Sequence, residues 1–140
     1  MTGNRGTSAW MAPEMWSAKE DVEEDAEHEY SQSVDVYAFA IIMWEALSFS
    51  APWGGLKVKK IRKKVITGDR PPVSKRNARD APDGYVDLMK RCWSQKDKRR
   101  PTFQTIYKEL VSMRVLLEEE KTTRKTFMGI LRRNTMVTVV

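Results

Sequence analysis

The chain has 140 residues, enough for one compact domain. Apolar residues make up 41% and charged residues 31% of it, a balance typical of a globular protein and not of a disordered segment. The net charge of +6 is unevenly spread, because residues 19–29 are acidic whereas residues 57–64 and 96–100 are basic.

The composition disfavours several kinds of chemistry. Cys92 is the single cysteine and His28 the single histidine, so we expect no intrachain disulfide, zinc site or Cys–His dyad, and a reducing cytoplasmic location fits. The longest apolar run, residues 36–44, is too short to cross a bilayer, and residues 1–6 lack the apolar run of a signal peptide. The basic run 57–64 contains no interleaved aromatic residue, so a solvated surface is favoured over nucleic-acid binding.

The first part of the chain is predicted to contain a loop, an insertion and a buried helix. Residues 1–16 mix Gly, Ser, Pro and Trp without a helical period, which predicts an ordered loop. Residues 17–33 follow as an acidic surface insertion.

The strongest helix is predicted over residues 34–47. Apolar residues recur there in steps of three and four: Val36, Tyr37, Ala40, Ile41, Trp44 and Leu47. Since the other side is apolar too, we expect this helix in a core.

Three more helices are predicted towards the C-terminus. A basic helix should end at Gly68, a short one should span residues 85–93, and the last should begin at Pro101. The last helix carries one apolar stripe: Phe103, Ile106, Tyr107, Leu110, Met113 and Leu117. The predicted helical body is residues 34–121. Residues 122–140 form a basic tail that could fray, pair as a strand or join to further sequence. No alternating strand pattern precedes the tail, so the predicted class is all-α.

Three motifs in order resemble protein kinases of the tyrosine-kinase-like group. Residues 6–14 (GTSAWMAPE) look like the end of the activation segment, and residues 35–45 (DVYAFAIIMWE) like the central buried helix. Residues 91–93 (RCW) and 98–103 (KRRPTF) resemble the junction before the last helix. The resemblance covers residues 3 to about 118 and is closest to mixed-lineage-type Ser/Thr kinases. It implies the C-terminal helical lobe of the protein-kinase fold.

The resemblance also implies a surface that binds protein substrates. Gly6, Thr7, Ser8 and Trp10 would form the wall that receives the residue after the acceptor. The sequence Gly-Thr-Ser-Ala-Trp favours Ser/Thr over Tyr specificity, although an ordinary loop hydroxyl is the simpler interpretation of Thr7. Thr2, Thr7 and Ser8 are candidate phosphorylation sites for an activation-segment switch.

Other matched residues are implied to be structural. Glu14 matches a glutamate that pairs with an arginine before the last helix, here Arg100. Asp35 matches an aspartate that holds the backbone of the catalytic loop, and helix-dipole stabilisation is the alternative interpretation. We expect Asp35 among apolar residues, where an unpaired carboxylate is costly. Core anchors without a chemical role complete the set: Trp44, Trp53, Trp93 and Phe103.

The motifs that do chemistry in protein kinases do not occur in these 140 residues. They are the Gly-rich loop, the Val-Ala-Ile-Lys lysine, His-Arg-Asp with its downstream Asn, and Asp-Phe-Gly. By resemblance ATP and Mg²⁺ belong to the complete kinase, and we expect no catalytic residue and no cofactor or metal site in this chain alone.

Three interpretations therefore stay open. The chain could be part of a Ser/Thr kinase that phosphorylates proteins in signal transduction. It could be a non-catalytic, pseudokinase-like binding module whose basic helix docks an acidic partner. It could also be a poorly stable remnant, whose central helix exposes apolar surface that the absent half of the domain would cover.

Overall fold

The structure, a computed structural model, describes residues 8–17 and 32–135, with side chains up to residue 131. Every regular element within these residues is helical, which confirms the predicted all-α class. In chain order the elements are η1 (Ser8–Trp10), α1 (Pro13–Ser17), α2 (Ser33–Ser48), η2 (Pro52–Gly55), α3 (Val58–Ile66), α4 (Lys75–Asp80), α5 (Tyr85–Cys92), η3 (Asp97–Arg99) and α6 (Phe103–Thr135). None of the helices in these ranges is long and apolar enough to span a membrane.

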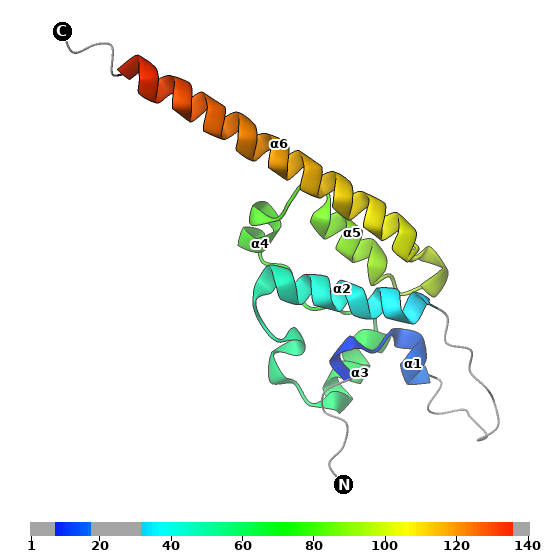
Figure 1. The fold of residues 1–140 in the computed structure, drawn as a ribbon. Helices are drawn as coiled ribbons and strands as arrows, with labels where there is room; N and C mark the ends of the chain where they lie inside the picture. Colours follow the sequence, from blue (N-terminus) through cyan, green and yellow to red (C-terminus); the bar gives the residue numbers. More distant parts are fainter. Residues whose placement is uncertain (1–7, 18–31, 136–140) are drawn as a thin grey trace.

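Helix α2 is the centre of the core. It packs against α5 and against the three short turns η1, η2 and η3, and Figure 1 shows it between α5 and α6 on one side and α1 and α3 on the other. Its buried residues share one side of the helix: Val36, Tyr37, Ala40, Ile41, Met43 and Trp44. The Tyr85 hydroxyl of α5 donates to the carbonyl of Met43 at 3.1 Å. Helix α2 therefore holds the other elements together.

Helix α2 lies in the core as predicted, but one of its faces is exposed. Asp35 and Ile42, seven residues apart, lie on that face and are exposed, and Ile42 is 51% accessible. Phe49, the residue after the helix, is 93% accessible. Phe103, predicted to be a core anchor, is also 39% exposed. It meets Phe39 edge to face, with ring centroids 5.9 Å apart. No element of the described residues covers this face, so its apolar side chains face solvent.

Two short helices are not among the predicted ones. Helix α1 begins at Pro13, whose fixed φ suits the first helical position, and Glu14 adds a favourable carboxylate in its first turn. Helix α4 follows Ser74, whose hydroxyl accepts a hydrogen bond from the Asn77 backbone N–H at 3.0 Å. Helices of five and six residues are too short to show a hydrophobic period, so only the proline and the cap indicate them.

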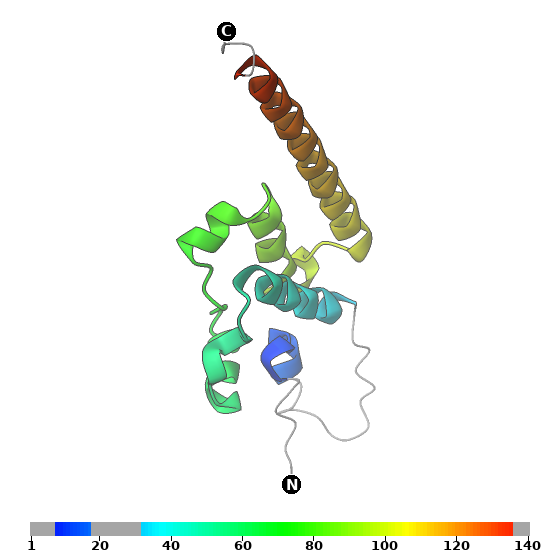
Figure 2. The same ribbon diagram turned by 60° about the vertical axis from the view of Figure 1, so that its left-hand side comes forward.

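Helix α6 passes through the predicted boundary at residue 121 and continues to Thr135. Residues 103–128 contain neither Gly nor Pro, which explains why no break occurs there. With 33 residues it is roughly 50 Å long. Ile106 is buried and Leu110 and Met113 pack against the core, whereas Tyr107, predicted in the same stripe, is exposed. Figures 1 and 2 show the second half of α6 projecting beyond the other helices.

Two adjacent isoleucines of α2 test which face forms the core. Ile41 is fully buried, so Ile41→Ala should lower the free energy of unfolding by about 2–5 kcal/mol, because it leaves a cavity. Ile42→Ala, on the exposed face, should cost less than about 1 kcal/mol. Urea unfolding of both variants measures the difference, and equal losses would contradict the exposed face.

Candidate functional site

The turn η1 contains the described part of the predicted substrate wall. The Trp10 indole donates to the Glu45 carboxylate of α2 at 2.9 Å. The Trp53 indole of η2 donates to the carbonyl of Ala9 at 3.2 Å. Ser8 is buried, with 8% of its surface accessible. The turn is thus fixed to two elements more than 30 residues away in the sequence.

The other residues assigned to the wall or to phosphorylation, Thr2, Gly6 and Thr7, lie outside the described residues. The same holds for most of the predicted acidic insertion at 17–33, of which Ser17 belongs to α1 and Ser33 opens α2. The roles of these residues stay predictions.

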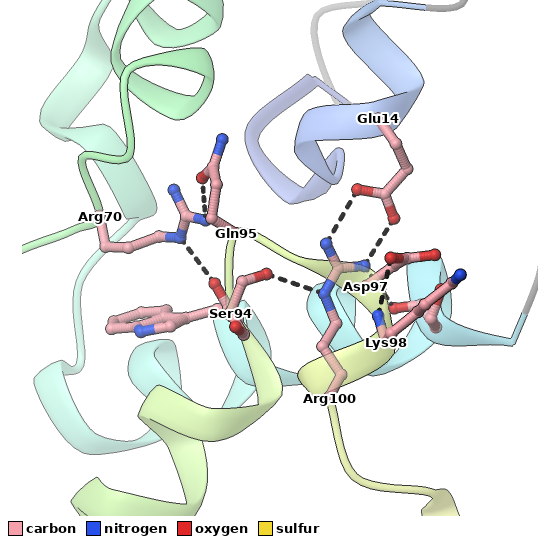
Figure 3. A network of polar contacts seen from close by, with 9 residues as sticks. Glu14, Arg70, Ser94, Gln95, Asp97, Lys98 and Arg100 are labelled. Atoms are coloured by element: carbon pink, nitrogen blue, oxygen red, sulfur yellow. Dashed lines mark hydrogen bonds and ion pairs between the residues drawn. The ribbon is translucent and has the colours of Figure 1, made fainter.

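The structure brings together Glu14 and Arg100, 86 positions apart, as a two-pronged ion pair. Arg100 Nη1 and Nη2 donate to the two Glu14 carboxylate oxygens at 2.6 and 2.8 Å. The same guanidinium donates to the carbonyl of Ser33 at 2.8 Å and to that of Ser94 at 3.0 Å. The Arg100 side chain is fully buried, whereas that of Glu14 is 37% exposed. Figure 3 shows that Arg100 links α1 to the segment before α6.

Arg70 makes a second, parallel network that the sequence interpretation did not include. Its guanidinium donates to the carbonyl of Trp93 at 2.9 Å and to the Gln95 side chain at 2.8 Å. The two arginines donate to adjacent carbonyls of the same loop, those of Trp93 and Ser94. Figure 3 shows Arg70 and Arg100 both reaching this loop. Arg70 stands beside Pro71 and Pro72 in the sequence, but nothing in that local pattern indicates its partners.

Tyr37 of α2 lies close to both arginines. Its ring centroid is 5.0 Å from the Arg70 guanidinium carbon and 5.2 Å from that of Arg100, within the range of cation–π attraction. Its buried hydroxyl has no hydrogen-bond partner in the described part of the chain. Burial raises the pKa of Tyr37 to about 12, and the two arginines oppose that rise without cancelling it.

The remaining predicted structural residues divide into anchors and an exposed carboxylate. Trp44 and Trp93 are buried, and the Trp44 indole donates to the carbonyl of Pro72 at 3.0 Å. Asp35 is exposed in the first turn of α2, so the expected cost of burying it does not arise here. Its place suits the helix dipole, and the family role implied for it stays a prediction.

No three metal-ligating side chains come together in residues 8–17 and 32–131. Burial raises the pKa of the Cys92 thiol to about 11, so at neutral pH it is protonated and packs as a small apolar group.

The all-helical core, with a Glu–Arg pair that joins α1 to the segment before α6, is consistent with the helical lobe of a protein kinase. The family model for protein tyrosine and serine/threonine kinases matches residues 1–110. The chain therefore belongs to this family.

Curated relatives agree with the family match. The chain is 36% identical over 106 residues to a probable LIM domain-containing serine/threonine-protein kinase of Dictyostelium discoideum, covering 76% of this chain and 10% of the relative. It is 35% identical over 107 residues to mitogen-activated protein kinase kinase kinase 7 of Drosophila melanogaster, covering 76% and 14%. A putative serine/threonine-protein kinase/receptor of Acanthamoeba polyphaga mimivirus is 32% identical over 108 residues, covering 77% and 6%. The chain thus spans only a small part of these relatives.

Removing Glu14 tests the ion pair. Glu14→Ala should lower the free energy of unfolding by about 3 kcal/mol, because the buried Arg100 charge loses its counter-ion. The matched control is Glu118→Ala on α6, which breaks an exposed pair with Arg114 and should cost less than about 1 kcal/mol. Similar losses in urea unfolding would show that the Glu14 pair adds no more than a surface contact.

The raised pKa of Tyr37 predicts alkaline destabilisation. An unfolded tyrosine ionises near pH 10, whereas folded Tyr37 keeps its proton to about pH 12, so the unfolded state releases protons first. The free energy of unfolding should therefore fall by up to about 2–3 kcal/mol between pH 10 and 12. Tyr37→Phe should remove this part of the slope and change stability at pH 7 little. Urea unfolding at several pH values measures it, and equal slopes for both proteins would contradict the assignment.

Proposed function

We propose that these residues form the substrate-side part of a Ser/Thr protein kinase domain. The observation that carries the proposal is that this region is attached to the core at three points, η1 through the Trp10 and Trp53 bonds and the following helix α1 through the Glu14–Arg100 pair. Catalysis of phosphoryl transfer depends mainly on positioning. A wall fixed at three points is suited to holding an acceptor peptide beside a catalytic loop.

The acceptor is proposed to be serine or threonine. The wall sequence Gly-Thr-Ser-Ala-Trp supports this, and the names of the relatives include serine/threonine-protein kinases. We also propose that Thr2 and Thr7 are phosphorylated in the complete domain. Ser8 would first have to leave its buried position, because a kinase needs access to its hydroxyl.

The chain alone is proposed neither to bind ATP nor to transfer phosphate. The groups that hold Mg²⁺·ATP and the aspartate base are absent from its sequence. Incubation of the purified chain with radiolabelled ATP should therefore give no more labelled product than an empty-vector preparation. Labelling above that background that depends on the chain would overturn this part of the proposal.

A chimera tests the positive part of the proposal. Residues 1–140 would follow the part of the kinase domain that precedes the matched region in the Drosophila relative. We expect labelled phosphoserine and phosphothreonine, but no phosphotyrosine, on a mixed protein substrate. The variant Trp10→Ala loses the bond to Glu45 and should lower kcat/KM by about tenfold or more. Phosphotyrosine as the main product would contradict Ser/Thr specificity, and an unchanged Trp10→Ala chimera would contradict the positioning role.

Docking of an acidic protein is a second candidate function. Helix α3 packs against η1 and α1, and the lysines on and just before it are exposed: Lys57, Lys59, Lys60, Lys63 and Lys64. Such a surface would favour association that weakens with salt. Pull-downs at low and high salt test this idea, and a Lys59→Glu/Lys63→Glu variant that recovers the same proteins would remove its basis.

A further inference from the structure

The second half of α6 exposes large apolar side chains outside the region matched by the family model, which ends at residue 110. Phe127 is 60% accessible, and Met128, Ile130 and Leu131 are exposed as well. Single exposed apolar residues are ordinary, but a group of them on one projecting helix marks an interaction surface. Figures 1 and 2 show that this half of the helix stands clear of the other described elements.

Six residues of α6, four apolar and two charged, form a stripe with a heptad period. Its members follow each other in alternate steps of four and three: Met113, Leu117, Glu120, Arg124, Phe127 and Leu131. The stripe continues the buried line of Ile106 and Leu110, so it lies on the side of α6 that faces the core in the first half. It is therefore a coiled-coil seam with a charged centre.

The stripe is symmetric about residue 122, so a second stripe running in the opposite direction would place complementary residues opposite each other. Leu117 and Phe127 lie five positions on either side of this point, since 122 − 5 = 117 and 122 + 5 = 127. Glu120 and Arg124 lie two positions on either side. An antiparallel copy centred here would place leucine against phenylalanine and glutamate against arginine, each pair occurring twice.

We propose that α6 pairs with α6 of a second copy of this chain, antiparallel and centred on Thr122. The two Glu120–Arg124 contacts would set the register, as a polar pair in an apolar seam does in coiled coils. A parallel pair in register would instead place Glu120 against Glu120 and Arg124 against Arg124. The charge order along the helix therefore selects the antiparallel arrangement.

A cavity at the base of the stripe leaves room for the end of the second helix. It has a volume of about 720 Å³ and lies between the Ala81–Asp83 loop and α6. Its α6 wall includes stripe residues and their neighbours: Met113, Leu116, Leu117, Glu120, Arg124 and Phe127. In the proposed register Leu131 of the second copy would reach the position opposite Met113, inside this cavity.

Charge exchange tests both the pairing and its direction. The chain is studied by sedimentation equilibrium, and we expect a dimer whose Kd rises at least tenfold in Glu120→Arg and in Arg124→Glu, because each puts like charges in contact. An equimolar mixture of these two variants should restore dimers, since every 120–124 contact across the heterodimer is again of opposite sign. The double variant E120R/R124E should also dimerise.

The mixture separates intermolecular pairing from effects within one helix. Glu120 and Arg124 are four positions apart, so each single variant also changes its own helix, and mixing cannot repair that change. Far-ultraviolet circular dichroism checks that both variants stay folded. Ile42→Ser, on the exposed face of α2, is the control for association through that face and should leave the Kd unchanged. A monomeric chain, single variants that dimerise like the parent, or a mixture that stays monomeric would each overturn the proposal.

Discussion

The buried guanidinium of Arg100 is the constraint on which the arrangement of the lobe depends. A charge removed from water must be met by partners in fixed positions, and Arg100 takes them from three separate places in the chain. Glu14 comes from α1, the Ser33 carbonyl from the start of α2, and the Ser94 carbonyl from the loop before α6. Moving any of these segments would leave the charge unsatisfied. Arg70 is held in a similar way, because its guanidinium donates to the carbonyl of Trp93, one residue before Ser94 in the same loop. The Tyr37 ring lies near both guanidinium groups. The Arg100 contacts thus fix α1, the start of α2 and the loop before α6 relative to one another.

Hydrophobic periodicity predicts the long elements well, because burial of one face is what makes a long helix stable. Helix α2, expected over 34–47, spans Ser33–Ser48, and α5, expected over 85–93, spans Tyr85–Cys92. Short helices such as α4 depend instead on one cap, that of Ser74, which a period cannot reveal. The Glu14–Arg100 pair could be predicted only through the family resemblance. The Arg70 network could not be predicted, since its acceptors are mainly backbone carbonyls that every sequence contains.

The exposed face of α2 has a physical explanation. A pattern of apolar residues shows which positions avoid water, but not which part of the protein covers them. Ile41 is covered by the described elements, whereas its neighbour Ile42 is exposed, although both are isoleucines in one helix. The exposed face includes Asp35, so the carboxylate and the apolar residues beside it share one uncovered surface. Under the proposed function this is the surface on which the preceding part of the domain would pack. The sequence of α2 thus fits a larger unit than the described residues form.

Helix α6 also exposes apolar side chains, at the other end of the lobe. Its first half is stabilised by burial of Ile106 and by the Arg91–Glu109 ion pair with α5. Beyond residue 110 it has surface ion pairs such as Arg114–Glu118, each worth about 0.3–0.5 kcal/mol. An isolated helical segment of this length is marginal in water, so contacts of that size stabilise it little. Burying Leu117 and Phe127 against another surface would contribute about 1.5–3 kcal/mol for each side chain. The segment beyond the family match therefore gains most of its stability only when its apolar stripe is covered, and the Glu120–Arg124 centre favours a covering helix of reversed direction.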